Sequence, residues 1–172
     1  TFDYTIIGGG LAGMQLALAF CNDSFFSEKR IAIIEPSSKT INDKTWCFWE
    51  KGSGKWDNLL LHQWETGLFY GAQKSISMDF GDYSYKMLPA LNFYNFAKAE
   101  ISKNSHIKWI EDRVVKVTGD EIIGENNVYK SSWIFDSRVP EKFQEDSKSV
   151  TVLQPFKGWV IETEKDEFDP ES

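Results

Sequence analysis

The stretch from Phe2 to Cys21, FDYTIIGGGLAGMQLALAFC, decides the fold class of this chain. Its first part, Phe2 to Ile7, is rich in β-branched and aromatic residues and predicts a strand that runs into a tight turn at three glycines. Its last part, Leu11 to Cys21, is rich in Ala, Leu and Met and predicts a buried helix. A second apolar run, Arg30 to Glu35, predicts a parallel strand inside a sheet. The chain therefore opens with a βαβ unit.

Three glycines of the turn, Gly8, Gly10 and Gly13, fit the GxGxxG pattern of a dinucleotide-binding loop. Alone the pattern is weak, but here it follows a strand and opens a helix within a βαβ unit of about 30 residues. Gly8 allows the tight turn, Gly10 lets the backbone approach a pyrophosphate, and Gly13 lets the helix pack on the strand. The helix N-terminus offers N–H groups and partial positive charge to the phosphates.

An acid stands at the end of the second strand. Glu35 lies about 20 residues beyond the glycines, where an acid hydrogen-bonds a ribose 2′-OH. A carboxylate would repel a 2′-phosphate, so FAD or NAD fits better than NADP. FAD is favoured because an aromatic segment, a helix and short strands follow, where an NAD dehydrogenase would continue with further βα units. The alternative is a glycine-rich turn followed by a solvated glutamate.

The rest of the chain predicts short strands around one more helix. Residues Asp43 to Tyr70 are aromatic and predict no regular element, whereas Pro89 to Lys103 predicts a helix with Pro89 in its first turn. Strands are expected at Ser75–Phe80, Tyr83–Leu88, His106–Ile110, Arg113–Thr118, Glu121–Ile123, Val128–Lys130, Ser132–Asp136 and Val150–Thr163. We expect the first two of these strands to pair through a turn at Gly81 and Asp82.

Composition limits the function classes. The formal charge is −7 and no Lys/Arg cluster marks a basic face, which argues against nucleic-acid binding and polybasic attachment to lipid. Two cysteines make no disulfide framework, no spacing suggests a metal, and Cys47 is expected to be buried. No transmembrane segment is apparent. A cytoplasmic setting is therefore expected, with peripheral membrane contact left open and no prediction of oligomeric state.

The order of elements resembles the FAD-binding fold of the glutathione-reductase and hydroxylase type, a Rossmann-like α/β fold. The resemblance implies a third parallel strand and a β-meander that complete the domain. It also implies backbone contacts near the adenine from the strand around Val114 and Val115, and an acid, Asp136, beside the ribityl chain or flavin phosphate. Each of these residues could instead be plain strand core or a surface acid.

Three segments together resemble the lycopene cyclase family of bacterial β-cyclases. They are Tyr4–Phe20 (YTIIGGGLAGMQLALAF), Asp43–Glu50 (DKTWCFWE) and Leu153–Thr163 (LQPFKGWVIET). The glycine segment is shared by many flavoproteins, so it discriminates little. The second segment is similar to D-[RK]-TWCFW and the third to Q-x-F-x-G-W-x-I-E-T, and these two are much more specific.

The resemblance implies a flavoprotein that cyclises the linear ends of lycopene, a carotenoid, into β-ionone rings without net redox change. It implies reduced FAD, with NAD(P)H as the source of electrons, and a carboxylic acid that protonates the polyene. The family's acidic motif, F-L-E-E-T, lies downstream of the Gly-Trp segment, so the catalytic residue is unknown and this chain is expected to be an inactive N-terminal portion. Trp46, Phe48 and Trp49 are expected to help wall the flavin and polyene region, with core packing as the alternative for each ring.

The resemblance also implies a domain division. Residues 1–145 are expected to form the FAD/NAD(P)-binding domain, with an aromatic insertion at about 43–88 that contributes to the substrate region, and residues 146–172 to begin a substrate domain. Two other functions stay open. One is a different FAD-dependent oxidoreductase, such as an aromatic hydroxylase or polyprenyl reductase, and the other is a dinucleotide-binding module without activity.

Overall fold

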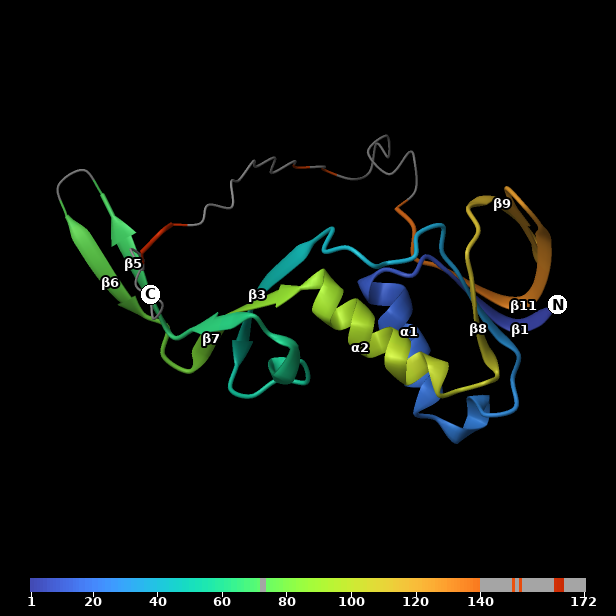
Figure 1. The fold of residues 1–172 in the computed structure, drawn as a ribbon, viewed down its shortest axis with the longest axis horizontal. Coiled ribbons are helices and arrows are strands. Elements are labelled where there is room, and N and C mark those ends of the chain that lie inside the picture. The colour runs from blue at the N-terminus through green and yellow to red at the C-terminus, as the bar shows by residue number, and fades with distance from the viewer. Residues whose placement is uncertain (72–73, 140–149, 151, 153–162, 166–172) are drawn as a thin grey trace.

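The computed structural model describes residues 1–71, 74–139, 150, 152 and 163–165. The described part is elongated, with a six-stranded sheet and two α-helices toward one end and a two-stranded hairpin at the other (Figure 1). In chain order the elements are β1 (Phe2–Ile7), α1 (Leu11–Cys21), η1 (Ser24–Phe26), β2 (Ile31–Ile34), β3 (Thr45–Lys51), η2 (Asp57–Leu59), β4 (His62–Trp64), β5 (Thr66–Tyr70), β6 (Ser75–Asp79), β7 (Tyr83–Pro89), α2 (Ala90–Ser102), β8 (Ile107–Ile110), β9 (Val114–Thr118), β10 (Glu121–Gly124) and β11 (Val128–Asp136).

The large sheet has the strand order β8-β2-β1-β11-β10-β9. Strands β8, β2, β1 and β11 run parallel, and β11, β10 and β9 form an antiparallel meander. Ile7 at the end of β1 stands in register with Ile34 on one side and Asp136 on the other. The predicted βαβ unit, the third parallel strand and the meander are all present, so the expected fold class is confirmed.

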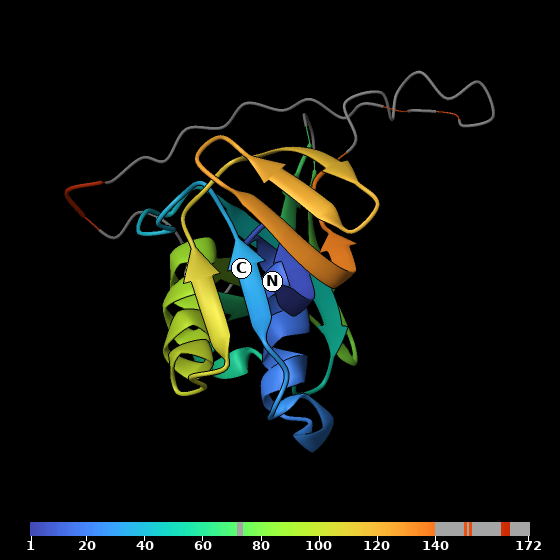
Figure 2. The ribbon, with the colours of Figure 1, turned by 90° about the vertical axis from the view of Figure 1, so that its right-hand side faces the viewer.

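The two faces of the parallel strands are covered by different elements, as Figure 2 shows. Alternate side chains such as Ile6, Ile31 and Ile33 share a core with α1 and α2. Their neighbours, including Ile7 and Ile34, share a second core with residues of the meander. Because both faces of β2 are covered, all four of its residues are buried, which is why its sequence is continuously apolar.

The aromatic segment forms its own small sheets. Strands β3, β7 and β4 make a three-stranded sheet, and β5 pairs with β6 in a separate two-stranded sheet. The expectation that Asp43–Tyr70 has no regular element is therefore wrong, and so is the expected pairing of Ser75–Phe80 with Tyr83–Leu88. The turn at Gly81 exists, with a φ of +63°, but the strand that follows it, β7, pairs with β3 from Tyr83 to Pro89 and not with β6. A turn signal in the sequence marks where the chain bends and does not specify the next partner.

A buried lysine fastens this sheet. Lys86 on β7 is 1% exposed, and its Nζ donates to Glu50 Oε2 at 2.9 Å, Asp57 Oδ1 at 2.7 Å and the Gly52 carbonyl at 3.0 Å. Burial by itself lowers the pKa of Lys86, but the hydrogen bonds and charges of the two carboxylates outweigh it and raise that pKa overall. A buried ammonium with three acceptors is satisfied, and it joins β3, β7 and the turn at η2.

Strand β11 is one continuous strand, although two separate strands were expected there. Its first part, Val128–Lys130, pairs with β10, and the part from Ser131 to Asp136 pairs with β1. The serines between the two apolar runs suggested a break, but the Ser131 side chain is buried and donates to the Trp133 carbonyl at 2.8 Å. The strand expected at Val150–Thr163, and the domain expected at 146–172, lie almost wholly outside the described residues. Within the described part, no helix has both the length and the apolar character needed to cross a bilayer.

Candidate dinucleotide site

The glycine turn after β1 combines three steric situations. Gly8 has a φ of +97°, a backbone conformation that residues with a side chain rarely adopt. A Cβ on Gly13 would lie 1.9 Å from the Gly8 carbonyl oxygen, so α1 can approach β1 only with glycine there. A Cβ on Gly10 would meet no protein atom within 4 Å. Gly8 and Gly13 are therefore required by the protein's own backbone, whereas Gly10 borders space that another molecule can occupy.

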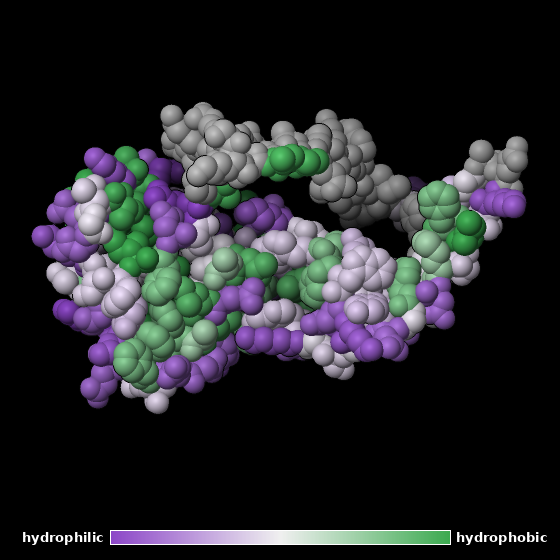
Figure 3. All heavy atoms as spheres, turned by 180° about the vertical axis from the view of Figure 1, so that it is seen from behind, coloured by the Kyte–Doolittle hydropathy of each residue, from purple (hydrophilic) through white to green (hydrophobic). Residues whose placement is uncertain are grey.

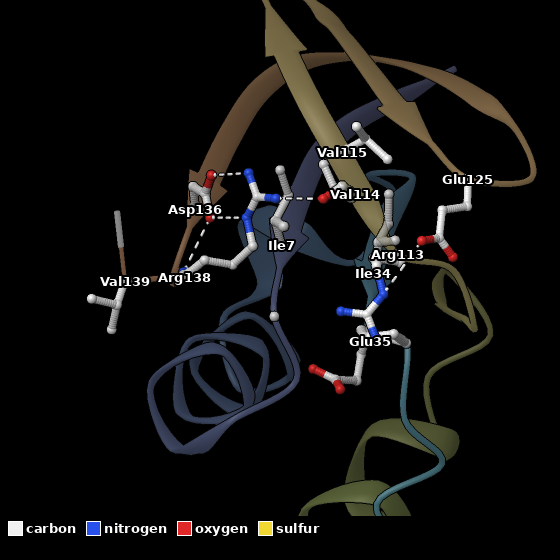
Figure 4. A pocket seen from close by; sticks show the side chains of 12 residues that line it. Ile7, Ile34, Glu35, Arg113, Val114, Val115, Glu125, Asp136, Arg138 and Val139 are labelled. Atoms are coloured by element: carbon white, nitrogen blue, oxygen red, sulfur yellow. Dashed lines mark hydrogen bonds and ion pairs between the residues drawn. The ribbon is translucent and has the colours of Figure 1, made fainter. Parts of the chain in front are cut away.

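A cleft of about 850 Å³ opens at the carboxyl ends of the parallel strands (Figure 4). Strands β1, β2 and β11 all end at this edge, because parallel strands place their carboxyl ends together. The cleft brings together five of the predicted site residues: Gly8, Glu35, Val114, Val115 and Asp136. Gly10 and Gly13 follow Gly8 into α1 and are not among the residues that line it.

Glu35 is held against the glycine turn. Its Oε2 accepts from the Gly9 backbone N–H at 2.7 Å and its Oε1 from the Ser37 N–H at 3.1 Å, and the residue is 7% exposed. Gly9 has no room for a side chain, because a Cβ there would lie 2.4 Å from the Trp109 ring and 3.0 Å from Glu35. Glu35 thus braces the turn, a role that the expected ribose contact did not include. A carboxylate can accept about four hydrogen bonds, so the brace leaves capacity for a ribose hydroxyl.

A short polar network extends from Glu35 toward the aromatic segment. Lys39 has φ of +52°, and its Nζ lies 3.5 Å from Glu35 Oε1 and 3.8 Å from Asp43 Oδ2. Asp43 also accepts a 3.0 Å hydrogen bond from the hydroxyl of Tyr94 on α2. Burial, and then the bond to Asp43, raise the pKa of Tyr94 well above its usual range. Asp43, the first residue of DKTWCFWE, therefore links the chain before β3 to α2 and, through Lys39, to Glu35 at the end of β2. The sequence offered no signal for these contacts.

Asp136 carries a matched positive charge. Arg138 donates to its carboxylate from Nε at 2.9 Å and Nη2 at 2.7 Å, and Arg138 Nη1 donates to the Val114 carbonyl (Figure 4). The Arg138 hydrogen bond lowers the pKa of Asp136, although partial burial opposes it. An unpaired carboxylate would repel a phosphate, and the guanidinium offsets that repulsion. The sequence did not single out Arg138, because Asp136 and Arg138 stand two residues apart in a polar stretch that looks like ordinary surface.

The opposite wall of the cleft is the start of β9. Val114 is buried in the core beneath the cleft, whereas Val115 is 63% exposed. Lys116 pairs with Ile123, and the next pair is Val114 with Gly124. The register therefore shifts here, and Val115 has no partner on β10. A β-bulge of this kind on an edge strand re-aims the chain and leaves backbone groups available to a ligand. The arginine that precedes it, Arg113, also lines the cleft, with its Nε 3.5 Å from Glu125 Oε1.

A buried acid joins the meander to the chain that follows β8. Asp112 is 3% exposed and accepts hydrogen bonds from the Tyr129 hydroxyl at 2.6 Å, from Asn126 and from the Arg113 N–H at 2.8 Å. Burial raises the pKa of Asp112, but these donors outweigh burial and lower it overall. Asp112 therefore sets the direction in which β9 leaves β8 and so positions the wall of the cleft.

A second cleft, of about 940 Å³, lies between the start of α1 and β3. It brings together Trp46 and Phe48 with other apolar side chains, and its lining is Leu11, Gln15, Thr45, Trp46, Cys47, Phe48, Trp56, Tyr85 and Leu88. Trp46 also packs edge-on against Phe93 at 5.8 Å and Tyr94 at 5.9 Å between ring centroids. Trp46 is therefore both part of the core and part of the cleft wall.

Trp49 does not share that cleft. Side chains of β3 alternate between faces, so Trp49 is 55% exposed on the other face, against Phe80 and Tyr85. The three rings expected to form one wall thus lie on two faces of one strand. The expectation that Cys47 is buried is wrong, because Cys47 shares the exposed face of β3 with Trp49. An unbroken aromatic run such as TWCFW conceals this alternation.

The architecture is a Rossmann-type FAD-binding fold, as in the solved structures that it resembles. PqsL of Pseudomonas aeruginosa, described as a probable FAD-dependent monooxygenase, has a TM-score of 0.60 at 12% identity, over 90% of this chain and 48% of PqsL. Halogenase PltM, solved with phloroglucinol and FAD, has a TM-score of 0.57 at 12% identity, over 84% of this chain and 36% of PltM. The chain spans less than half the length of these proteins, and identities this low establish the fold alone.

The sequence comparison is more specific. The family model described as lycopene cyclase protein matches residues 3–172, so the chain belongs to the lycopene cyclase family. The match confirms the predicted resemblance to this family, and its range includes the glycine turn and the segments Asp43–Glu50 and Leu153–Thr163. No curated protein sequence matches the chain.

Proposed function

We propose that this chain is part of a flavoprotein that cyclises the linear ends of lycopene. The observation that carries the proposal is the family match over residues 3–172. The two clefts support it, because they begin on either side of the glycine turn and differ in chemistry. The first, at the carboxyl ends of the parallel strands, has five charged side chains among its lining residues, whereas the second is lined mainly by aromatic and aliphatic side chains.

The residues of the first cleft fit FAD. The pyrophosphate would lie against the turn at Gly10, where no side chain intrudes, and at the N-terminus of α1. Glu35 would accept from a ribose hydroxyl, and the backbone at Val115 would meet the adenine. Asp136, with its charge matched by Arg138, would stand beside the ribityl chain or a phosphate.

The second cleft fits a hydrocarbon chain. Its tryptophan and phenylalanine side chains exclude water and present π faces, which attract positive charge. Reduced FAD would supply electron-rich stabilisation of the cation that forms when a polyene end is protonated. Trp46 and Phe48 would orient the polyene and keep water from quenching that cation. The acidic motif that the family resemblance implies does not occur in this sequence, so no residue here is assigned as the proton donor.

The test uses the complete polypeptide of the natural reading frame with FAD, lycopene and NAD(P)H under anaerobic conditions. We expect chromatography to show β-carotene or its one-ringed intermediate, with no consumption of NAD(P)H beyond that needed to reduce the flavin. Stoichiometric oxidation of NAD(P)H with each product molecule would instead indicate a redox flavoenzyme and would overturn the cyclase proposal. A polypeptide that releases no flavin on denaturation would overturn the flavoprotein proposal as well.

A further inference from the structure

The loop between β2 and β3, residues 35–44, runs from one cleft to the other. Its first residues, Glu35 and Pro36, line the first cleft, and Thr45, which follows the loop, lines the second. Seen from behind, hydrophilic side chains border hydrophobic ones in the middle of the molecule, next to β3 (Figure 3). A residue that fixes this loop can therefore affect both clefts.

The loop is fastened along α2 by hydrogen bonds from side chains and from the first backbone N–H groups of that helix. These bonds join Lys98 Nζ to the Ser38 carbonyl (2.7 Å), the Tyr94 hydroxyl to Asp43 Oδ1 (3.0 Å), the Leu91 N–H to Asn42 Oδ1 (3.1 Å) and the Ala90 N–H to the Lys44 carbonyl (2.9 Å). Because one face of α2 belongs to the buried core, these bonds fix the course of the loop between the two clefts.

Lys39 stands in the middle of this loop, with its charge turned inward. Among the described residues it is the only non-glycine with a positive φ, +52°, which is unfavourable for a residue with a side chain. Its side chain is 12% exposed, and its Nζ lies 3.5 Å from Glu35 Oε1, 3.8 Å from Asp43 Oδ2 and 5.4 Å from the centre of the Tyr94 ring. Burial of an ammonium is also unfavourable unless nearby groups compensate it. Both costs are met here in order to place one positive charge between two carboxylates.

The two acids differ in their relation to the first cleft. Glu35 lines it and accepts from the glycine turn, whereas Asp43 is not among its lining residues. Asp43 is held from the other side by Tyr94, whose ring packs edge-on against Trp46 in the wall of the second cleft. Without Lys39, Glu35 would present an uncompensated negative charge near the place of a cofactor's pyrophosphate, and the two would repel each other.

We propose that Lys39 is a positioning residue for FAD and that Asp43 holds it in place, so that the first acid of DKTWCFWE contributes to FAD binding without touching FAD. Lys39 keeps the Glu35 carboxylate at the glycine turn and offsets its charge, and Asp43 keeps the ammonium beside Glu35. This role rests on the proposed function, because it concerns the FAD of that site. It gives Asp43 a task that the lining of the cleft alone does not indicate.

The first test measures the dissociation constant of FAD for variants of the complete polypeptide by fluorescence titration. Lys39→Met removes the charge and should weaken FAD binding by about tenfold, whereas Lys39→Arg keeps the charge and should stay within about threefold of the parent. Lys39→Gly removes the same charge but suits a φ of +52°. It should lose as much affinity as Lys39→Met. A Lys39→Gly variant that binds FAD as the parent does would overturn the proposal, because the charge would then be dispensable.

A double-mutant cycle tests the dependence on Asp43. Asp43→Asn keeps an oxygen for the Tyr94 hydroxyl but removes the charge that holds Lys39. It should weaken FAD binding by about threefold in the parent and have no effect in the Lys39→Met background. Additive effects, or no effect of Asp43→Asn in the parent, overturn the proposal.

A matched control lies at the opposite end of β2. Arg30, just before that strand, forms an ion pair with Asp3 at 3.3 Å, so Arg30→Met removes a cation that pairs across β1 and β2 but lies away from the cleft. FAD binding should be unchanged in Arg30→Met. A loss as large as that in Lys39→Met would overturn the proposal, since any ion pair beside β2 would then have the same effect.

Failure of this role and failure of the proposed function give different results. A parent polypeptide that binds no FAD overturns both. A parent that binds FAD as tightly as Lys39→Met and Asp43→Asn do overturns only the role of Lys39. Thermal midpoints without FAD are measured for every variant. If Lys39→Arg lowers both the midpoint and the affinity as much as Lys39→Met does, Lys39 serves the packing of the loop, and the positioning role is overturned.

Discussion

Glu35 at the end of β2 accepts a 2.7 Å hydrogen bond from the backbone N–H of Gly9 in the turn after β1. Because of this bond, the Glu35 carboxylate is already part of the glycine turn and is not a free side chain available only to a ribose. The conformation of the turn and the position of the acid therefore depend on each other. Lys39, 3.5 Å from the same carboxylate, extends this dependence to Asp43 and to the aromatic segment.

Replacing Glu35 should weaken FAD binding through this brace. Glu35→Ala removes the acceptor proposed for a ribose hydroxyl and the acceptor that holds the Gly9 N–H in the turn, so FAD should lose a hydrogen bond and meet a less ordered turn, which weakens binding by about 1–3 kcal/mol, or roughly 5- to 150-fold in the dissociation constant. Glu35→Gln keeps an acceptor oxygen and should lose less. Fluorescence titration with FAD measures both, and equal affinity for FAD in the parent and in Glu35→Ala would contradict the assigned role.

The glycine turn offers a pair of substitutions with opposite expected effects. Gly10→Val places its Cβ where no neighbouring side chain or strand lies within 4 Å, so the fold should persist while the pyrophosphate is blocked and FAD binding is abolished. Gly13→Ala places a Cβ 1.9 Å from the Gly8 oxygen and should destabilise the fold itself by about 1–3 kcal/mol. Urea unfolding and flavin content distinguish the two. Normal flavin content in Gly10→Val would show that the pyrophosphate does not bind at this turn.

The buried ammonium of Lys86 should contribute strongly to the stability of the β3-β7-β4 sheet. Lys86→Met leaves Glu50 and Asp57 facing each other without a cation, and because both acids are about one-third exposed we expect a loss of about 2–3 kcal/mol. Lys51→Met is the control, since its partner Asp82 and Lys51 itself are both mostly exposed, and it should cost about 0.5 kcal/mol or less. Equal losses in denaturant unfolding would show that burial of Lys86 contributes nothing.

The Asp112–Tyr129 hydrogen bond predicts how stability depends on pH. The folded-state pKa of Asp112 is lowered, so its contribution is complete above the unfolded pKa of about 4 and is lost as the pH falls below it. Burial, and then the bond to Asp112, raise the pKa of Tyr129 to about 12, so its contribution is complete below about pH 10 and is lost as the pH rises toward the folded value.

Unfolding free energies of the parent, Asp112→Asn and Tyr129→Phe across this range test both branches. The difference between the parent and Asp112→Asn should shrink at acidic pH, and the difference between the parent and Tyr129→Phe should shrink at alkaline pH. Differences that stay constant across the whole range would show that neither group is coupled to folding.

Much of the cleft at the carboxyl ends of the parallel strands was predictable because its signals are local. The turn at Gly8, the close packing at Gly13 and the acid after β2 follow from glycine spacing and an apolar run within one βαβ unit. The prediction that Asp136 belongs to the same site followed only from the fold resemblance, and the structure places Asp136 in the lining of this cleft. Arg138 and Asp112, which supply charge and hydrogen bonds around the same cleft, stand in polar stretches that look like ordinary surface.

By itself, the sequence determined the βαβ unit, the helix that follows Pro89 and membership of the lycopene cyclase family, because spacing and residue type along the chain suffice for these. Only the tertiary structure decided that β7 pairs with β3 rather than β6. It also decided that Trp46 and Trp49 lie on opposite faces of β3, and that Lys86 is buried among acids more than 25 residues away. These outcomes depend on which distant surfaces exclude water from a given side chain, and no stretch of the sequence contains that information on its own.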